Sequence, residues 1–298
     1  MERKKLLPSY TAPVKIIIVV IAVFLIMLFF SSFYVFYNST HPEKIISQET
    51  PLKYGYNYED VEFKSDNLIL KGWFIPAKNF TTNKVIIALH GYPFDKGDIL
   101  NQTLFLLKDY NLLLFDFRYF GFSQGKYTTL GFKEQADVLA AINYLKSKGY
   151  NEIGILGFSM GGATALMAAE KTKDIKAITA DSAFANLDMV FRKEKFDNVP
   201  VKGILLFTTR LISKTLLGLD TKEVSPMDSV KNYDTPILII HSENDDYVNV
   251  DNAYLINNNA RNPELWIVKD TNAKHALEYN AVKEEYENRV LEFFKKRV

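Results

Sequence analysis

The chain has 298 residues, of which 48% are hydrophobic, so it is long enough for one large domain with a sizeable core. Its 36 basic residues nearly balance its 35 acidic residues, and this balance points neither to nucleic acid nor to an acidic partner. It has no cysteine, which excludes disulfides, thiolate chemistry and cysteine-based zinc sites.

The N-terminus carries a basic segment followed by a long apolar run. Residues 1–15 include Arg3, Lys4 and Lys5, and residues 16–37 carry no charge. A helix over 16–37 would be roughly 33 Å long, enough to cross a hydrocarbon core of roughly 30 Å. Aromatic residues at its far end are typical of a membrane interface. The basic flank predicts a cytoplasmic N-terminus, with the rest of the chain extracytoplasmic.

Two other interpretations of the apolar run fit its length and composition less well. A cleaved signal peptide normally has a shorter apolar region that ends in small residues, whereas this run is long and ends in bulky aromatic residues. A buried core helix would be shorter and would have a polar face. We therefore expect an uncleaved signal-anchor helix, then a linker over 38–58 and a folded domain over 59–298.

From residue 59 onward, strand-like apolar runs alternate with helical patterns. We expect strands at 61–65, 68–75, 84–89, 112–117, 152–158, 175–180, 236–240 and 265–268. We expect helices near 98–108, at 132–147, directly after Ser159, near 251–259 and at 279–297. Continuous apolar strands that alternate with helices predict an α/β fold with a mostly parallel, doubly wound sheet.

The long mixed segment 184–233 is predicted to form a small helical cap. Within it, residues 201–218 have apolar side chains near helical spacing, and basic residues lie on the other side. This pattern is typical of a helix that packs on the domain. The alternative is a lid that contacts acyl chains or the membrane surface.

A strand, a sharp turn and a helix surround the sequence Gly157-Phe158-Ser159-Met160-Gly161. This G-x-S-x-G pattern in that context is typical of a serine nucleophile on a strained turn. The flanking glycines allow the close packing that the turn requires. The backbone N–H of Met160, at the start of the helix, is then placed to stabilise an oxyanion.

The same pattern occurs a second time, around Ser123, within residues 121–125. Here four residues separate the preceding strand from the motif, and no apolar helix follows. We therefore interpret Ser123 as a loop residue and not as a nucleophile.

A serine nucleophile requires a base, and the chain has four histidines: His41, His90, His241 and His275. His41 lies in the linker, and His90 and His241 end strands. His275 lies in a loop after the last strand, from which it could reach a serine at the carboxyl edge of a parallel sheet. We expect His275 to be the base.

An acid should orient the base, and the loop after the strand at 236–240 offers three: Glu243, Asp245 and Asp246. Their positions in the loop alone do not show which of the three orients the base. The chain order of serine, acid and histidine is the order of the α/β-hydrolases.

Five segments, in this order, resemble that superfamily: residues 89–92, 116–125, 157–162, 240–245 and 274–275. The domain 59–298 resembles the bacterial membrane-anchored or exported serine hydrolases, the eukaryotic ABHD-type hydrolases and the serine aminopeptidase-like group. The chain departs from the common pattern at Ser242 and Ala273, where glycine is frequent.

The resemblance assigns roles to individual residues. It implies that Ser159 is the nucleophile, that His275 is the base and that Asp245 is the acid, with Asp246 as the fallback. It implies that the backbone N–H groups of Tyr92 and Met160 form the oxyanion hole.

The function that the resemblance implies is a membrane-anchored serine hydrolase. Such an enzyme would cleave carboxylic esters, such as acyl esters or lipids, through an acyl-enzyme, with no metal and no organic cofactor. A peptidase, a thioesterase or an amidase would use the same triad. A catalytically inactive binding protein with a hydrolase fold is the alternative from another class.

Overall fold

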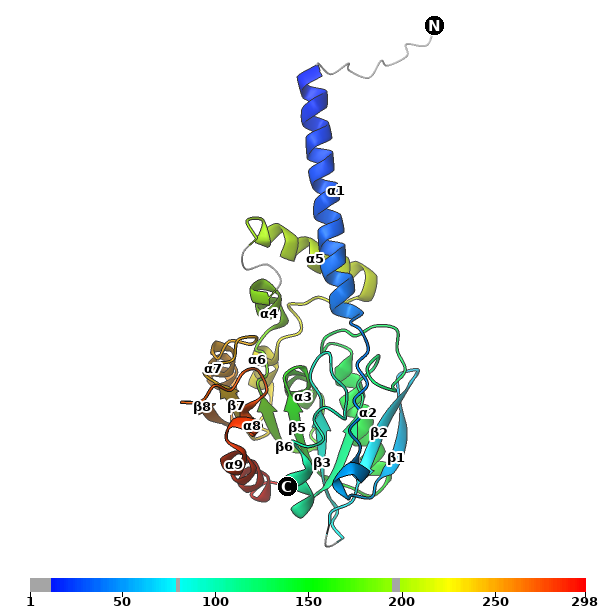
Figure 1. Cartoon of the computed structure of the whole chain (residues 1–298), viewed down its shortest axis with the longest axis vertical. Helices are drawn as coiled ribbons and strands as arrows, with labels where there is room; N and C mark the ends of the chain where they lie inside the picture. Colours follow the sequence, from blue (N-terminus) through cyan, green and yellow to red (C-terminus); the bar gives the residue numbers. More distant parts are fainter. Residues whose placement is uncertain (1–11, 79–80, 195–198) are drawn as a thin grey trace.

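The computed structural model describes residues 12–78, 81–194 and 199–298, so Arg3, Lys4 and Lys5 lie outside the described residues. Helix α1 (Ala12–Thr40) rises away from an α/β domain that contains the rest of the described chain (Figure 1). It contains the whole of the expected span 16–37. Within the described residues, α1 is the one helix long and apolar enough to cross a membrane, with a mean hydropathy of 3.1.

The domain is built on one eight-stranded sheet with the order β1-β2-β4-β3-β5-β6-β7-β8. The strands are β1 (Glu59–Ser65), β2 (Leu68–Ile75), β3 (Lys84–Leu89), β4 (Asn111–Phe115), β5 (Glu152–Phe158), β6 (Ile175–Asp181), β7 (Ile237–Ser242) and β8 (Pro263–Val268). The strands from β3 to β8 are parallel, whereas β1 and β2 form an antiparallel edge. The predicted mostly parallel sheet is confirmed.

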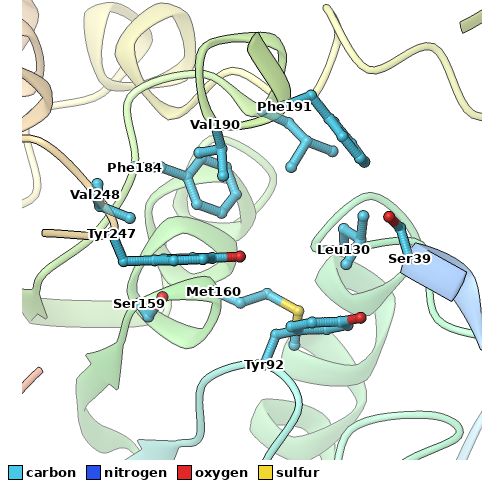
Figure 2. Close-up of a pocket in the computed structure, with 11 residues that line it drawn as sticks. Ser39, Tyr92, Leu130, Ser159, Met160, Phe184, Val190, Phe191, Tyr247 and Val248 are labelled. Atoms are coloured by element: carbon cyan, nitrogen blue, oxygen red, sulfur yellow. The ribbon is translucent and has the colours of Figure 1, made fainter. Parts of the chain in front are cut away.

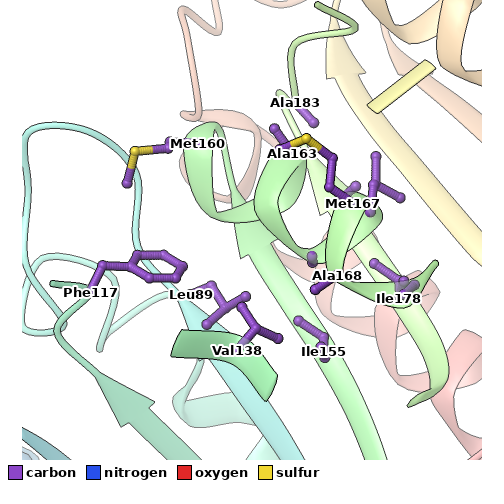
Figure 3. Close-up of a cluster of buried hydrophobic side chains, with 14 of the residues drawn as sticks. Leu89, Phe117, Val138, Ile155, Met160, Ala163, Met167, Ala168, Ile178 and Ala183 are labelled. Atoms are coloured by element: carbon purple, nitrogen blue, oxygen red, sulfur yellow. The ribbon is translucent and has the colours of Figure 1, made fainter. Parts of the chain in front are cut away.

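Helices cover both faces of the sheet. Along β3, Val85 and Ile87 contribute to the core on one face, and Ile86 and Ala88 contribute to the core on the other. The first core includes α2 (Glu134–Ser147), α3 (Met160–Ala169) and α7 (Asp251–Asn259), and Figure 3 shows part of it. The second core includes α9 (Lys283–Lys295). Burial on both faces explains why these strands are continuously apolar.

Two predicted helices differ in the structure. The helix expected near 98–108 is reduced to turns and a 3-10 helix, η2 (Leu104–Lys108). The hydroxyl of Thr103 donates to the Leu100 carbonyl at 2.8 Å, and such local bonds compete with helical pairing. The helix expected at 279–297 is divided into α8 (Glu278–Ala281) and α9, because the chain leaves helical geometry at Val282 (φ −135°, ψ 47°).

The cap consists of α4 (Leu187–Glu194), α5 (Lys202–Leu217), α6 (Pro226–Ser229) and η3 (Val230–Asn232). Helix α5 covers nearly all of the predicted helix 201–218. It packs against the domain-proximal part of α1 (Figure 1), where the hydroxyls of Ser32 and Thr208 form a hydrogen bond.

The segment after α1, expected to be a linker, lies along the surface of the domain. The carbonyl of Thr40 accepts a hydrogen bond from the Thr128 amide at 2.9 Å. The amide of Ser47 donates to Asp95 Oδ2 at 3.0 Å. Residues 51–54 form the 3-10 helix η1 (Pro51–Tyr54). These contacts hold the end of α1 and the residues that follow it against the domain.

Candidate active site

Ser159 stands at the sharp turn between β5 and α3. Its φ of 49° and ψ of −115° lie outside the ordinary regions for a residue with a side chain. The turn is held by a hydrogen bond of 2.8 Å from the Ser159 amide to the Asp181 carbonyl at the end of β6. A Cβ at Gly161 would lie 2.3 Å from the Leu89 carbonyl oxygen, so only glycine fits there. The backbone thus presents the Ser159 hydroxyl at the carboxyl edge of the sheet.

The structure brings Ser159, His275 and Asp245 into one hydrogen-bonded line. His275 Nε2 lies 2.8 Å from Ser159 Oγ, and His275 Nδ1 lies 2.7 Å from Asp245 Oδ2. With Nδ1 protonated and donating to the carboxylate, Nε2 is free to accept the serine proton. This arrangement is able to generate a serine nucleophile.

The carboxylate of Asp245 is buried but well supported. The amides of Tyr247 and Val248 donate to its Oδ1 at 2.9 and 2.7 Å, and His241 Nε2 lies 3.2 Å from its Oδ2. Burial opposes the charge on Asp245, but hydrogen bonds from His241 and His275 outweigh it and hold the pKa of Asp245 below its usual range. Asp245 is therefore an anion that can orient and stabilise a protonated His275.

The other two candidate acids are used elsewhere. Glu243 Oε1 accepts a hydrogen bond from the Asp270 amide at 2.8 Å, and Asp246 Oδ2 lies 3.2 Å from Lys274 Nζ. Neither side chain has a hydrogen bond to His275 among the described contacts.

The remaining serine and histidine candidates have local contacts. Ser123 lies in a buried loop and donates to the Asp116 carbonyl at 2.6 Å. His90 is buried; its Nδ1 donates to the Gly91 carbonyl and its Nε2 accepts from the Phe117 amide, while burial lowers the pKa of its imidazole. His41 stacks on Tyr37. His90 thus fixes the loop that precedes Tyr92.

Two backbone segments lie close to Ser159. Met160 is the first residue of α3, so its N–H has no acceptor within the helix. Gly91 passes so close to Ser159 that a Cβ there would lie 3.3 Å from Ser159 Cβ. The next residue, Tyr92, lines a pocket together with Ser159 and Met160.

This pocket is mainly apolar, and the cap forms much of its wall (Figure 2). It is lined by Ser39, Tyr92, Leu130, Ser159, Met160, Phe184, Leu187, Val190, Phe191, Tyr247 and Val248. In Figure 2, Ser159 lies on one side and Ser39, from the last turn of α1, on the other. The Tyr92 hydroxyl donates to the Asn38 carbonyl at 3.3 Å, and burial raises the pKa of Tyr92 to about 12. The end of α1 therefore closes part of the pocket.

A buried polar network lies beneath the three loops that carry Ser159, Asp245 and His275. Ser182 Oγ lies 3.0 Å from Asp181 Oδ1 and 2.8 Å from Glu278 Oε1, and it accepts from the Ala276 amide at 3.1 Å. The Glu278 carboxyl also accepts from the Ser242 amide at 2.7 Å. These bonds connect the ends of β6 and β7 to the residue after His275.

The network holds a proton between its two carboxyls. The Ser182 hydroxyl has one proton and can donate it to only one of the two carboxyls. The other carboxyl forms a hydrogen bond with Ser182 Oγ only if it carries a proton of its own. Burial and the neighbouring Glu278 raise the pKa of Asp181 well above its usual value. The Asp181 side chain also accepts from Tyr286 Oη at 2.7 Å. We therefore assign the proton to Asp181.

Sequence reasoning did not find Ser39, Tyr247 or this network. Tyr247 follows Asp245 closely, and its position after the acid was the available signal. Ser39 is distant in sequence from the residues it joins at the pocket, and no local pattern marks it. Asp181 directly follows a predicted strand and Glu278 directly precedes a predicted helix, where an acid is unremarkable.

Comparisons with known proteins agree with this fold. The prolyl oligopeptidase family matches residues 120–298. The protein YqkD of Bacillus subtilis (strain 168) is 31% identical over 290 residues, which cover 92% of this chain and 93% of that protein. A solved structure of the Pyrococcus furiosus esterase Pf2001 is 29% identical, with a TM-score of 0.70, and covers 86% of this chain and 99% of that chain.

A further solved structure supports the fold alone. Est1E of Butyrivibrio proteoclasticus with bound ferulic acid is 22% identical, with a TM-score of 0.63, over 80% of this chain and 98% of that chain. Together, these similarities confirm the α/β-hydrolase fold and identify a hydrolase.

Proposed function

Because the chain belongs to the prolyl oligopeptidase family, we propose that it is a serine hydrolase that cleaves carboxylic esters. The observation that carries the proposal is the continuous line of hydrogen bonds from Ser159 through His275 to Asp245. It stands at the edge of an apolar pocket, as an acyl-transfer enzyme requires.

The reaction would proceed in two acyl-transfer steps. Ser159 Oγ attacks the ester carbonyl carbon while His275 Nε2 takes its proton. The negative charge on the carbonyl oxygen is stabilised by the backbone N–H groups of Met160 and Tyr92. His275 then gives the proton to the departing alkoxide. Water, activated by the same histidine, hydrolyses the acyl-enzyme and restores Ser159.

The apolar pocket suits the acyl part of an ester. The described residues that line it carry no charged side chain, whereas a second pocket at Ser159 and His275 includes Asp98. Phe184, Val190 and Phe191 offer an apolar wall for an acyl chain. Peptidase, thioesterase and amidase activity use the same triad and are the alternative outcomes of the test below.

We further propose that α1 remains attached as a membrane anchor. Its side chains Phe36 and Ser39 are buried against the domain, and Phe36 is only 4% exposed. Cleavage directly after the apolar run 16–37 would remove Phe36 and the helix that holds Ser39 in the pocket wall. The basic residues before α1 favour an N-terminus in the cytoplasm and a domain outside it.

Labelling with a fluorophosphonate probe tests the proposal. We expect the full chain in membranes to react, the Ser159→Ala variant to lose the reaction, and a Ser147→Ala variant, altered at an exposed serine, to keep it. Wild-type protein should then hydrolyse p-nitrophenyl esters faster than amino-acid p-nitroanilides. A folded wild-type protein that does not react would instead support the inactive binding protein.

A further inference from the structure

The position of α5 along α1 bears on how the protein sits in a bilayer. The groove between the two helices is lined by Leu25, Leu28, Phe29, Phe33, Thr208, Leu211, Ile212, Thr215 and Leu216. Every described residue of α1 before Leu28 is exposed. The contact with α5 therefore begins near the middle of the apolar run and not at its end.

The length of α1 places this contact within the bilayer. The uncharged part of α1 before Leu25 extends from Ile16 to Phe24, about 14 Å of helix. A hydrocarbon core is roughly 30 Å thick, so about 16 Å of the segment that contacts α5 would also lie inside it. Helix α5 cannot remain in water while its partner segment on α1 is in the hydrocarbon.

The chemistry of α5 fits that depth. Its side chains Ile204, Phe207 and Leu211 stand three and four residues apart and are exposed, Phe207 by 60% and Leu211 by 55%. Single exposed apolar residues are common, but a stripe beside an exposed apolar helix is typical of a membrane-contacting surface.

The basic side chains near the middle and end of α5 bind acids of the cap. Arg210 pairs with Asp188 and lies 3.7 Å from Asp220, and Lys214 Nζ lies 2.9 Å from Asp220 Oδ2. Arg210 and Lys214 are thus paired with acids of the cap, although Lys214 stays 59% exposed at the end of the stripe. The exposed residues Ile204, Phe207 and Leu211 before it are apolar.

We infer that α5 is embedded, with α1, in the leaflet on the side of the domain, and that it admits the acyl chain of a membrane lipid to the Ser159 pocket. Helix α4 connects the two, since it packs on α5 and supplies Leu187, Val190 and Phe191 to the pocket wall. Ser39 places the pocket at the base of α1. The substrate class is an ester of a bilayer lipid, an inference that rests on the proposed ester hydrolase.

The chain contains no cysteine, so single labels can measure the depth of α5 directly. In the Phe207→Cys variant of the full chain, an NBD fluorophore is attached at position 207. The labelled protein is reconstituted in vesicles of phosphatidylcholine and phosphatidylglycerol. Leu52→Cys, in η1 and also exposed, is the matched control. We expect lipids with a spin label on the acyl chain to quench the label at 207, and iodide to quench the label at 52. Quenching at 207 by iodide and not by the lipids would overturn the embedding.

A second measurement tests access to the site. Phe207→Glu should lower the hydrolysis of long-chain lipid esters in vesicles by about tenfold or more, since an apolar anchor is lost, with the rate on a short soluble ester unchanged. Tyr254→Glu, at an exposed position of α7, should change neither rate. Equal losses on both esters would contradict lipid access. Wild-type protein that cleaves neither ester would contradict the proposed function, and the quenching result would still decide the depth of α5.

Discussion

Ser242 donates a hydrogen bond from its hydroxyl to the carbonyl oxygen of Ala273 at 2.8 Å. These are the two positions at which the chain departs from the glycines that are frequent in related hydrolases. Ser242 precedes Asp245, the proposed acid, and Ala273 precedes His275, the proposed base. The two departures thus contact each other and join the loops that carry the acid and the base.

Replacing Ser242 by glycine should lower kcat on a soluble ester with little change in KM. The variant loses two hydrogen bonds of the Ser242 hydroxyl, to the Ala273 carbonyl and from the Asn244 amide. Each is worth about 0.5–1.5 kcal/mol, and loss of the bond that joins the two loops corresponds to roughly two- to tenfold in rate. Steady-state kinetics on p-nitrophenyl butyrate measures the effect, with Ser147→Ala as the control. A change in KM alone would contradict the positioning role.

Asp245→Asn and Asp246→Asn provide a matched pair. The first variant should lower kcat by as much as about 10⁴-fold, because the amide no longer stabilises a protonated His275. The second removes a surface contact to Lys274 and should leave kcat within about twofold. Comparable losses in the two variants would be inconsistent with Asp245 as the orienting acid.

Asp181→Asn should change how stability depends on pH. Because the pKa of Asp181 is raised in the folded state, its contribution is fully present below the unfolded value of about 3.9 and is lost as pH rises through the folded value. The amide imitates the protonated acid and does not ionise. Relative to wild type, the variant should therefore become more stable as pH rises from 5 to 9, measured by urea unfolding. Parallel pH profiles would rule out a proton on Asp181.

Gly161→Ala and Gly203→Ala should have opposite effects on stability. A Cβ at Gly161 would collide with the Leu89 carbonyl and should destabilise the fold by about 1–3 kcal/mol or more. A Cβ at Gly203, in α5, meets no atom within 4 Å and should stabilise the helix by roughly 0.5–1 kcal/mol. Urea unfolding of both variants provides the comparison, and a tolerated alanine at 161 would contradict the tight turn.

The sequence was most informative where function requires a local pattern. The turn at Ser159 needs glycines beside the serine, so the local pattern pointed to Ser159. Position alone left Glu243, Asp245 and Asp246 open, and the choice of Asp245 rested on the family resemblance.

The division of the last helix could not be predicted from the sequence, because it depends on Glu278 reaching Ser182 and Ser242 across the fold. The placement of Ser39 in the pocket depends in the same way on long-range packing.

The segment after α1 has a consequence for how the enzyme would meet its substrate. Hydrogen bonds from the Thr128 amide to the Thr40 carbonyl and from the Ser47 amide to Asp95 tie the end of α1 and the segment after it to the domain. If α1 anchors the protein in a bilayer, as we propose, the site would therefore keep a fixed distance from the membrane surface and a fixed orientation toward it. Its encounters with lipids would occur by lateral diffusion in two dimensions. The rate would then follow the mole fraction of substrate in the leaflet and not its concentration in bulk water.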